Sequence, residues 1–140
     1  MNTKTKGDIA ESKVLSALVK HFDVSIPFGD NTRYDLVVDD GNKIWRVQVK
    51  HARCEDGKMT FNTVSCPTLR GNDRKRENYK GDADIFAAYA TKIDQIAFVT
   101  VEEVGERGQM TLRYSSTKNG QKRGINWLDD YKNWPVAQTG

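Results

Sequence analysis

The sequence contains few of the residues that build zinc clusters or disulfide frameworks. Only two cysteines, Cys54 and Cys66, and two histidines, His21 and His51, occur among its 140 residues. The cysteines are twelve positions apart with no accompanying Cys or His pair, which excludes the usual four-ligand zinc spacing. We expect free thiols, as in a reducing cytoplasm, unless the intervening segment folds back and joins them. Neither histidine has a partner pattern, so both are interpreted as structural or surface residues.

Long apolar runs are also absent. No run approaches the roughly 18 residues of a membrane-spanning helix, and the N-terminus MNTKTKGD lacks the apolar region of a signal peptide. Charged residues make up 29% and hydrophobic residues 37% of the chain, which is typical of a globular protein. We expect a cytoplasmic protein with one domain over 1–140 and no contact with a membrane. The net charge of +3 is too mild to establish a polyanionic partner by itself.

Residues 7–22 have a helical pattern that contains one carboxylate in an unusual place. At about 100° per residue, one arc collects the apolar side chains of Val14, Leu15, Leu18, Val19 and Phe22. Glu11 projects to the middle of this arc. An ionised glutamate is rarely buried without a partner. Glu11 therefore either reaches solvent in the first turns, favouring the helix dipole, or acts as a ligand that points toward a sheet.

Residues 34–50 predict a β-hairpin. Asp40-Gly41 is a strong two-residue turn, because glycine accepts the positive φ that a primed turn needs. A turn centred there places Asp35 opposite Arg46, and it makes Asp35 and Gln48 diagonal neighbours roughly 7–8 Å apart. Since side chains alternate across a strand, one face of the hairpin carries Asp35, Arg46, Gln48 and Lys50. The other face is an apolar layer of Leu36, Val38, Trp45, Val47 and Val49.

The rest of the chain predicts an α/β domain with a mixed central sheet flanked by helices. Extended segments are expected at 24–27, 59–64 and 110–114. The continuous apolar runs at Ile85–Ala90 and 96–101 are typical of fully buried central strands. Residues 125–134, INWLDDYKNW, predict a short amphipathic helix. Its apolar residues Trp127, Leu128, Tyr131 and Trp134 either cap the chain's own core or form an interface with another subunit.

Glu11 from the helix and Asp35, Gln48 and Lys50 from the hairpin converge in this arrangement. Asp35 and Gln48 offer side-chain oxygens, Val49 offers a backbone carbonyl, and Glu11 approaches from the helix. Oxygen ligands of this kind suit a hard divalent cation such as magnesium. Lys50, on the same strand face, is placed to orient an attacking water or to steady developing phosphate charge. The sequence therefore predicts a metal-assisted hydrolytic site.

The set of Glu11, then Asp35, then Gln-Val-Lys at 48–50 resembles the PD-(D/E)XK nuclease superfamily. The resemblance implies a restriction-endonuclease-like core over about 6–101 and hydrolysis of DNA phosphodiesters with magnesium, for which manganese would substitute. The opening helix and hairpin resemble archaeal Holliday junction resolvases. The whole length resembles homing endonucleases of group I introns, a branch known from a cyanobacterial transfer-RNA gene whose members use QVK-like tripeptides. Two departures are Tyr34 in place of a proline and Gln48 in place of an acidic residue.

The resemblance implies a site-specific endonuclease of double-stranded DNA, with Asp35, Gln48, Lys50 and Glu11 as catalytic residues. A Holliday junction resolvase and a restriction enzyme remain alternatives in the same class. A DNA-binding domain that lost its chemistry through Gln48, and a plain interaction domain, remain alternatives from other classes. A duplex break needs two sites, so a homodimer or homotetramer is expected.

Two basic segments, about 67–81 and 115–124, are candidates for contact with DNA phosphates. Residues 70–80 carry five basic and two acidic residues, a local net charge of +3, and 118–123 carry three basic residues and no acid. Such runs are often solvated loops, but on a nuclease core they would neutralise phosphates, and asparagines or glutamines would read adenine edges. The candidate DNA-binding residues are Arg70, Asn72, Arg74, Lys75, Arg76, Lys80, Lys118, Asn119, Gln121, Lys122 and Arg123.

Overall fold

The computed structural model describes residues 2–29, 31–65, 77–117 and 119–135. The chain forms, in order, α1 (Thr3–Val19), β1 (Asp23–Ser25), β2 (Leu36–Asp39), β3 (Ile44–Glu55), β4 (Lys58–Asn62), β5 (Val64–Ser65), β6 (Glu77–Asn78), β7 (Ile85–Ala90), β8 (Gln95–Thr100), α2 (Val101–Val104), β9 (Gln109–Arg113) and a 3-10 turn, η1 (Leu128–Tyr131). Among the described residues, no helix is both long enough and apolar enough to cross a membrane.

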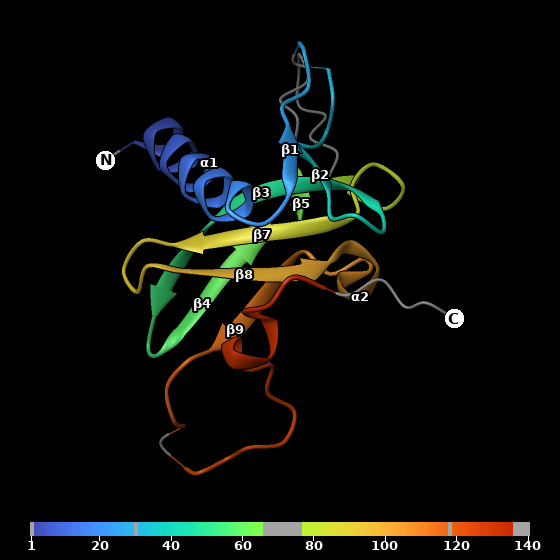
Figure 1. The fold of residues 1–140 in the computed structure, drawn as a ribbon. Coiled ribbons are helices and arrows are strands. Elements are labelled where there is room, and N and C mark those ends of the chain that lie inside the picture. Colours follow the sequence, from blue (N-terminus) through green and yellow to red (C-terminus); the bar gives the residue numbers. More distant parts are fainter. Residues whose placement is uncertain (1, 30, 66–76, 118, 136–140) are drawn as a thin grey trace, which may run out of the picture.

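The long strand β3 organises a mixed sheet, because it changes partners along its length. Its first residues pair antiparallel with β2, which is bordered by β1. Its middle pairs parallel with β7, and its last residues pair antiparallel with β4, which continues to β9. In Figure 1 the β4–β9 pair crosses beneath β7 and β8, while α1 covers the other face. The expected α/β fold with a mixed sheet is confirmed.

Two apolar clusters fill the space on either side of the central strands. Ile85, Ala87 and Tyr89 of β7 face α1, whose Ala10, Val14 and Leu18 are buried against them. The alternate residues Phe86, Ala88 and Ala90 face β4, β9 and η1. Because β7 is covered on both faces, all six of its residues are buried, as the sequence predicts for a central strand. The run at 96–101 differs, since β8 borders only β7 among the strands described.

Helix α1 begins four residues earlier and ends three residues earlier than the apolar pattern predicts. Asn2 caps it, because its Oδ1 accepts a hydrogen bond of 2.8 Å from the Thr5 N–H. The buried stripe consists of residues four apart, as expected for a helix on a sheet. Val19, which was expected on the buried arc, lies at the helix end and is 53% exposed.

The hairpin forms, but its predicted register is wrong by two residues. Leu36 lies opposite Val47 and Val37 opposite Arg46, so Asp35 flanks Gln48 rather than Arg46. The turn is longer than expected because Asp40 ties it together: its Oδ1 accepts the N–H groups of Asn42 and Lys43. A shift of two residues preserves the face on which each side chain lies. The predicted polar and apolar faces are therefore correct despite the wrong pairing.

The C-terminal segment forms one 3-10 turn at Leu128–Tyr131 instead of a helix over 125–134. Leu128 is 2% exposed within the core between β7 and β9. Trp134 reaches the α1 face, where its ring packs against Phe22, Trp45 and Phe98. These residues therefore cap the chain's own core. Cys54 is a free thiol, and Cys66 lies outside the described residues.

Candidate active site

Asp35 lies where strand β2 meets the middle of β3, and its side chain takes part in the sheet. Its backbone N–H donates to the Val47 carbonyl at 2.8 Å, and its Oδ2 accepts a hydrogen bond of 2.8 Å from the Val49 N–H. One carboxylate oxygen thus continues the strand pairing beyond Leu36. No hydrogen bond to Oδ1 occurs within the described parts of the chain, so this oxygen is available to a ligand.

Gln48 and Lys50 lie on the same face of β3, because Val47 and Val49 are buried in the cluster beneath α1. Both polar side chains are half-buried. Lys50 Nζ donates a hydrogen bond of 3.1 Å to the hydroxyl of Tyr79. The Gln48 amide Nε2 lies 3.3 Å from the Val49 carbonyl oxygen, so the two oxygen donors expected at a metal are adjacent.

Glu11 of α1 is half-buried, and the charge of Asp35 acts on it. Burial raises the pKa of the Glu11 carboxyl, and the negative charges of Asp35 and Asp8 raise it further. Burial also raises the pKa of Asp35, against the opposing effects of the Val49 N–H and the Lys50 charge. Two carboxylates whose ionised forms are disfavoured make a site that a cation would stabilise. The half-buried position of Glu11 is compatible with a ligand role.

Three comparisons with known proteins bear on this site. A model of the family described as PD-(D/E)XK endonuclease matches residues 1–134. The chain belongs to this family. It is an endodeoxyribonuclease, and the nucleases of this family generally use divalent metals. A search of curated proteins gave no match.

A search of solved structures gives a similar architecture in "the structure of a bacterial homing endonuclease: I-Ssp6803I". The two chains are 26% identical, with a TM-score of 0.77, over 94% of this chain and 89% of the other. The nuclease fold and the resemblance to homing endonucleases that the sequence predicts are both confirmed.

The donors present in this endonuclease fit a hard divalent cation. Asp35 and Glu11 supply carboxylate oxygens, Gln48 an amide oxygen and Val49 a carbonyl oxygen, which are the ligand types that magnesium and manganese prefer. No group of three or more His, Cys, Asp or Glu side chains suited to a metal occurs in the described ranges. With only two carboxylates among these donors, a cation held here would depend on neutral oxygens as well.

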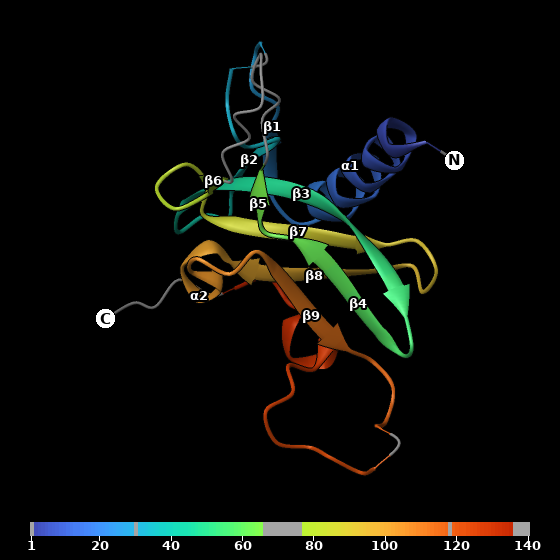
Figure 2. The same cartoon turned by 180° about the vertical axis from the view of Figure 1, so that it is seen from behind.

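Only some of the residues proposed for DNA contact lie within the described parts of the chain. Lys80, Asn119, Gln121, Lys122 and Arg123 are all exposed, whereas Arg70, Asn72, Arg74, Lys75, Arg76 and Lys118 lie outside the described residues. Asn119 accepts the Gln121 N–H, and the Gln121 amide donates to the Arg123 carbonyl, so these two amides shape their own loop. Figures 1 and 2 place this loop at the opposite end of the molecule from β1 and β2.

Two residues at the site escape sequence reasoning. Tyr79 contacts the site lysine from 29 positions away, and the Arg33 guanidinium packs on the ring of the same tyrosine. The available signal was an aromatic residue within the basic run RKRENYK, where a solvated loop would not need one. Arg46, expected beside Asp35, instead pairs with Asp84 at 3.1 Å.

Proposed function

We propose that this endonuclease cuts double-stranded DNA at specific sites, with magnesium as its cofactor, in the manner of a homing endonuclease. The observation that carries the proposal is that the Asp35 carboxylate binds the Val49 N–H, between Gln48 and Lys50 of β3, and that its charge acts on Glu11. Likeness to a bacterial homing endonuclease over most of both chains supports the homing role. Manganese, which accepts the same oxygen donors, is expected to replace magnesium.

The residues of the proposed site divide into metal ligands and one positively charged side chain, Lys50. Asp35, Gln48, the Val49 carbonyl and Glu11 would hold the metal, which when bound neutralises phosphate charge and acidifies a water. Lys50, fixed by Tyr79, presents its remaining ammonium protons to the water or to the phosphate. Gln48 Nε2 now faces the Val49 oxygen, so presenting its Oε1 there requires a half-turn of the amide.

A randomised duplex library incubated with magnesium, followed by sequencing of the cut ends, tests the proposal. We expect one recurrent cleavage sequence with the parent chain and none with Asp35→Ala or Lys50→Ala. Lys92→Ala, which removes an exposed lysine of the β7–β8 turn, is the matched control and is expected to cut normally. Equal cutting by Lys50→Ala and the parent would overturn the proposed site.

Three further outcomes separate the alternatives. Preferential cutting of a four-way junction over the same sequence as a linear duplex would identify a resolvase. Salt-sensitive binding without cleavage in magnesium or manganese would identify a binding domain. Absence of both would leave an interaction domain.

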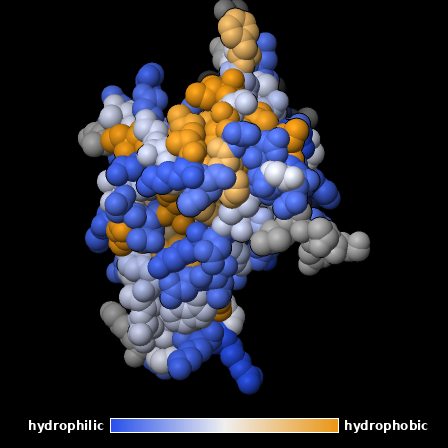
Figure 3. Space-filling view, viewed as in Figure 1, coloured by the Kyte–Doolittle hydropathy of each residue, from blue (hydrophilic) through white to orange (hydrophobic). Residues whose placement is uncertain are grey.

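We further propose that two or four copies assemble to cut both strands. Tyr131 and Trp134 of the C-terminal segment pack against the chain's own core, so the contact surface is expected elsewhere. Large apolar side chains that remain exposed are Val19, Ile26, Phe28 and Ile44. Figure 3 shows apolar side chains gathered in the upper half of the face that carries α1 and β1. Sedimentation equilibrium of the parent and of Ile26→Lys measures the assembly, which the lysine is expected to weaken.

A further inference from the structure

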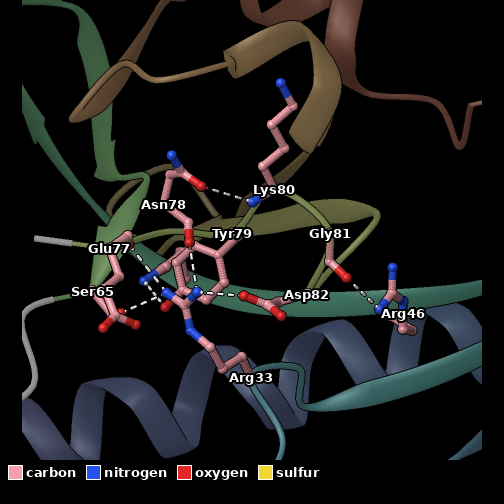
Figure 4. Close-up of polar contacts among 10 residues, drawn as sticks. Arg33, Arg46, Ser65, Glu77, Asn78, Tyr79, Lys80, Gly81 and Asp82 are labelled. Carbon is pink, nitrogen blue, oxygen red and sulfur yellow. Dashed lines mark hydrogen bonds and ion pairs between the residues drawn. The ribbon is translucent and has the colours of Figure 1, made fainter.

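Tyr79 contacts both the site lysine and a guanidinium. Its hydroxyl accepts the 3.1 Å hydrogen bond from Lys50 Nζ, and that nitrogen lies 4.8 Å from the ring centroid. The guanidinium carbon of Arg33 lies 4.1 Å from the same centroid. Figure 4 shows the Arg33 side chain against the tyrosine ring and among the residues that flank it.

The tyrosine is rigidly held. It is 5% exposed, and the ring of Phe86 packs edge-on against it at a centroid distance of 5.4 Å. Its backbone carbonyl accepts the N–H groups of Asp82 and Ala83 at 2.9 and 3.1 Å, which closes a turn before β7. Its hydroxyl is therefore a fixed acceptor, unlike a hydroxyl on a surface loop.

Arg33 connects Tyr79 to the segment that contains Asp35 and leads into β2. It donates to the carbonyls of Asn78 and Glu77, the two residues of β6, at 2.5 and 3.1 Å. It also donates to Ser65 Oγ at 2.6 Å and to Asp82 Oδ2 at 2.8 Å. Since Arg33 precedes Asp35 by two residues, one short segment positions the carboxylate and the tyrosine together.

Building on the proposed function, we propose that Tyr79 is a positioning residue for Lys50 and that Arg33 holds Tyr79 in place. A lysine side chain has four rotatable bonds and loses much conformational freedom when it is fixed. The Tyr79 hydroxyl selects one placement of the ammonium before DNA binds, and this lowers the ordering required in the transition state. One ammonium proton goes to Tyr79, and two remain for the water or the phosphate.

Single-turnover cleavage of the identified DNA site tests this role. Tyr79→Phe removes one oxygen and keeps the ring, so we expect about tenfold slower cleavage, or about 1.4 kcal/mol in the barrier, with unchanged DNA affinity and melting temperature. Tyr131→Phe, which removes a hydroxyl bonded to Glu103, is the matched control and is expected to cut at the parent rate. Arg33→Lys, which cannot stack or bridge in the same way, is expected to slow cleavage as well.

A double-mutant cycle separates positioning from a general structural role. In a Lys50→Arg background, Tyr79→Phe is expected to have little further effect, because the group it positions has been replaced. A full tenfold loss in that background, or parent-like cleavage by Tyr79→Phe, would overturn the proposal. Equal slowing by Tyr131→Phe would also overturn it.

A readout without cleavage distinguishes this proposal from the proposed function. Lysines methylated with isotope-labelled formaldehyde give separate NMR signals, and the Lys50 signal is identified by its loss in Lys50→Arg. We expect Tyr79→Phe to move and sharpen this signal, as a freer side chain would, and Tyr131→Phe to leave it unchanged. If the parent does not cut DNA, the proposed function fails. An unmoved Lys50 signal overturns the positioning role whether or not the parent cuts.

Discussion

Asp35 and Asp84 occupy equivalent places in the sheet, yet replacing each by asparagine is expected to change stability in opposite directions. Each directly precedes a strand that borders β3, and each accepts a backbone N–H from β3 through its Oδ2. Asparagine keeps an acceptor oxygen at both places. The substitutions therefore test the charge and not the presence of the hydrogen bond.

The directions in which the pKa values of the two carboxyls are shifted set the sign of each stability change. Burial raises the pKa of Asp35 above its ordinary 3.8. The protonated carboxyl therefore favours the folded state at low pH, and this contribution is lost as pH rises through the raised pKa. For Asp84, burial acts the same way, but hydrogen bonds and the charge of Arg46 outweigh it and lower the pKa. Its contribution is present above 3.8 and is lost as pH falls through the lowered value.

Asp35→Asn removes the charge that burial disfavours, and it also removes a charge that raises the pKa of Glu11. We therefore expect added stability of about 1 kcal/mol, the ordinary size of a point-mutation effect, or about 3 °C in Tm. Asp84→Asn leaves the Arg46 guanidinium without its anion. Because these side chains are 36% and 23% exposed, solvent screening limits the loss to about 1–2 kcal/mol.

Urea unfolding at pH 7 and at pH 3 measures both effects, and the gain of Asp35→Asn is expected to shrink at the lower pH. Magnesium at a hundred times its Kd is expected to add about 2.7 kcal/mol to the parent and to Asp84→Asn, and nothing to Asp35→Asn. Cleavage is lost only in Asp35→Asn. A loss of stability of the same size in both variants would refute the reasoning.

Three further changes test the remaining features. Gln48→Glu places a third carboxylate near Asp35 and Glu11, so it is expected to lower Tm without metal. It is also expected to lower the magnesium concentration that gives half-maximal cleavage. An unchanged magnesium titration would exclude Gln48 as a ligand. Burial opposes the ionised form of Asp40, but hydrogen bonds from Asn42, Lys43, Trp45 and Trp134 outweigh it and lower the pKa to about 2. The stability that Asp40 provides is therefore present above pH 3.8 and lost as pH falls toward 2. Asp40→Ala is expected to abolish this acid-dependent loss, measured by unfolding followed by tryptophan fluorescence. Replacing both Lys122 and Arg123 by alanine is expected to reduce the slope of log affinity against log salt by about 2 if both contact phosphates, and an unchanged slope would place the DNA elsewhere.

Periodicity predicted which side chains share a face far better than which strands are neighbours. Asp35, Gln48 and Lys50 stayed together although the hairpin register was wrong, because a shift of two residues leaves the alternation intact. The turn length depended on Asp40 binding two backbone N–H groups, which a dipeptide preference does not include.

Long-range packing was the part that the sequence did not predict. The run at 96–101 resembles a central strand because Trp134, from the far end of the chain, packs against Phe98. An apolar run predicts that a strand is buried, but it does not predict whether a neighbouring strand or a distant side chain covers it. The contact of Tyr79 with Lys50 was missed for the same reason, since only the fold joins them.

The position of the site follows from the change of partners along β3. Just before β2 begins, the Val49 N–H donates to Oδ2 of the Asp35 carboxylate instead of to the backbone of another strand. Among the strands described, the other carboxylate oxygen, Oδ1, takes no part in the sheet. Glu11 is then brought to the same half-buried place, where burial raises the pKa of both carboxyls. A third carboxylate at position 48 would add repulsion that the metal-free fold must withstand. A glutamine adds an oxygen without adding charge, so Gln48 fits the proposed metal site, which would rely on neutral donors. On this reasoning Gln48→Ala, which removes the oxygen at constant charge, is expected to impair cleavage more than Gln48→Glu. The reverse order, measured at saturating magnesium, would show that position 48 acts through its charge.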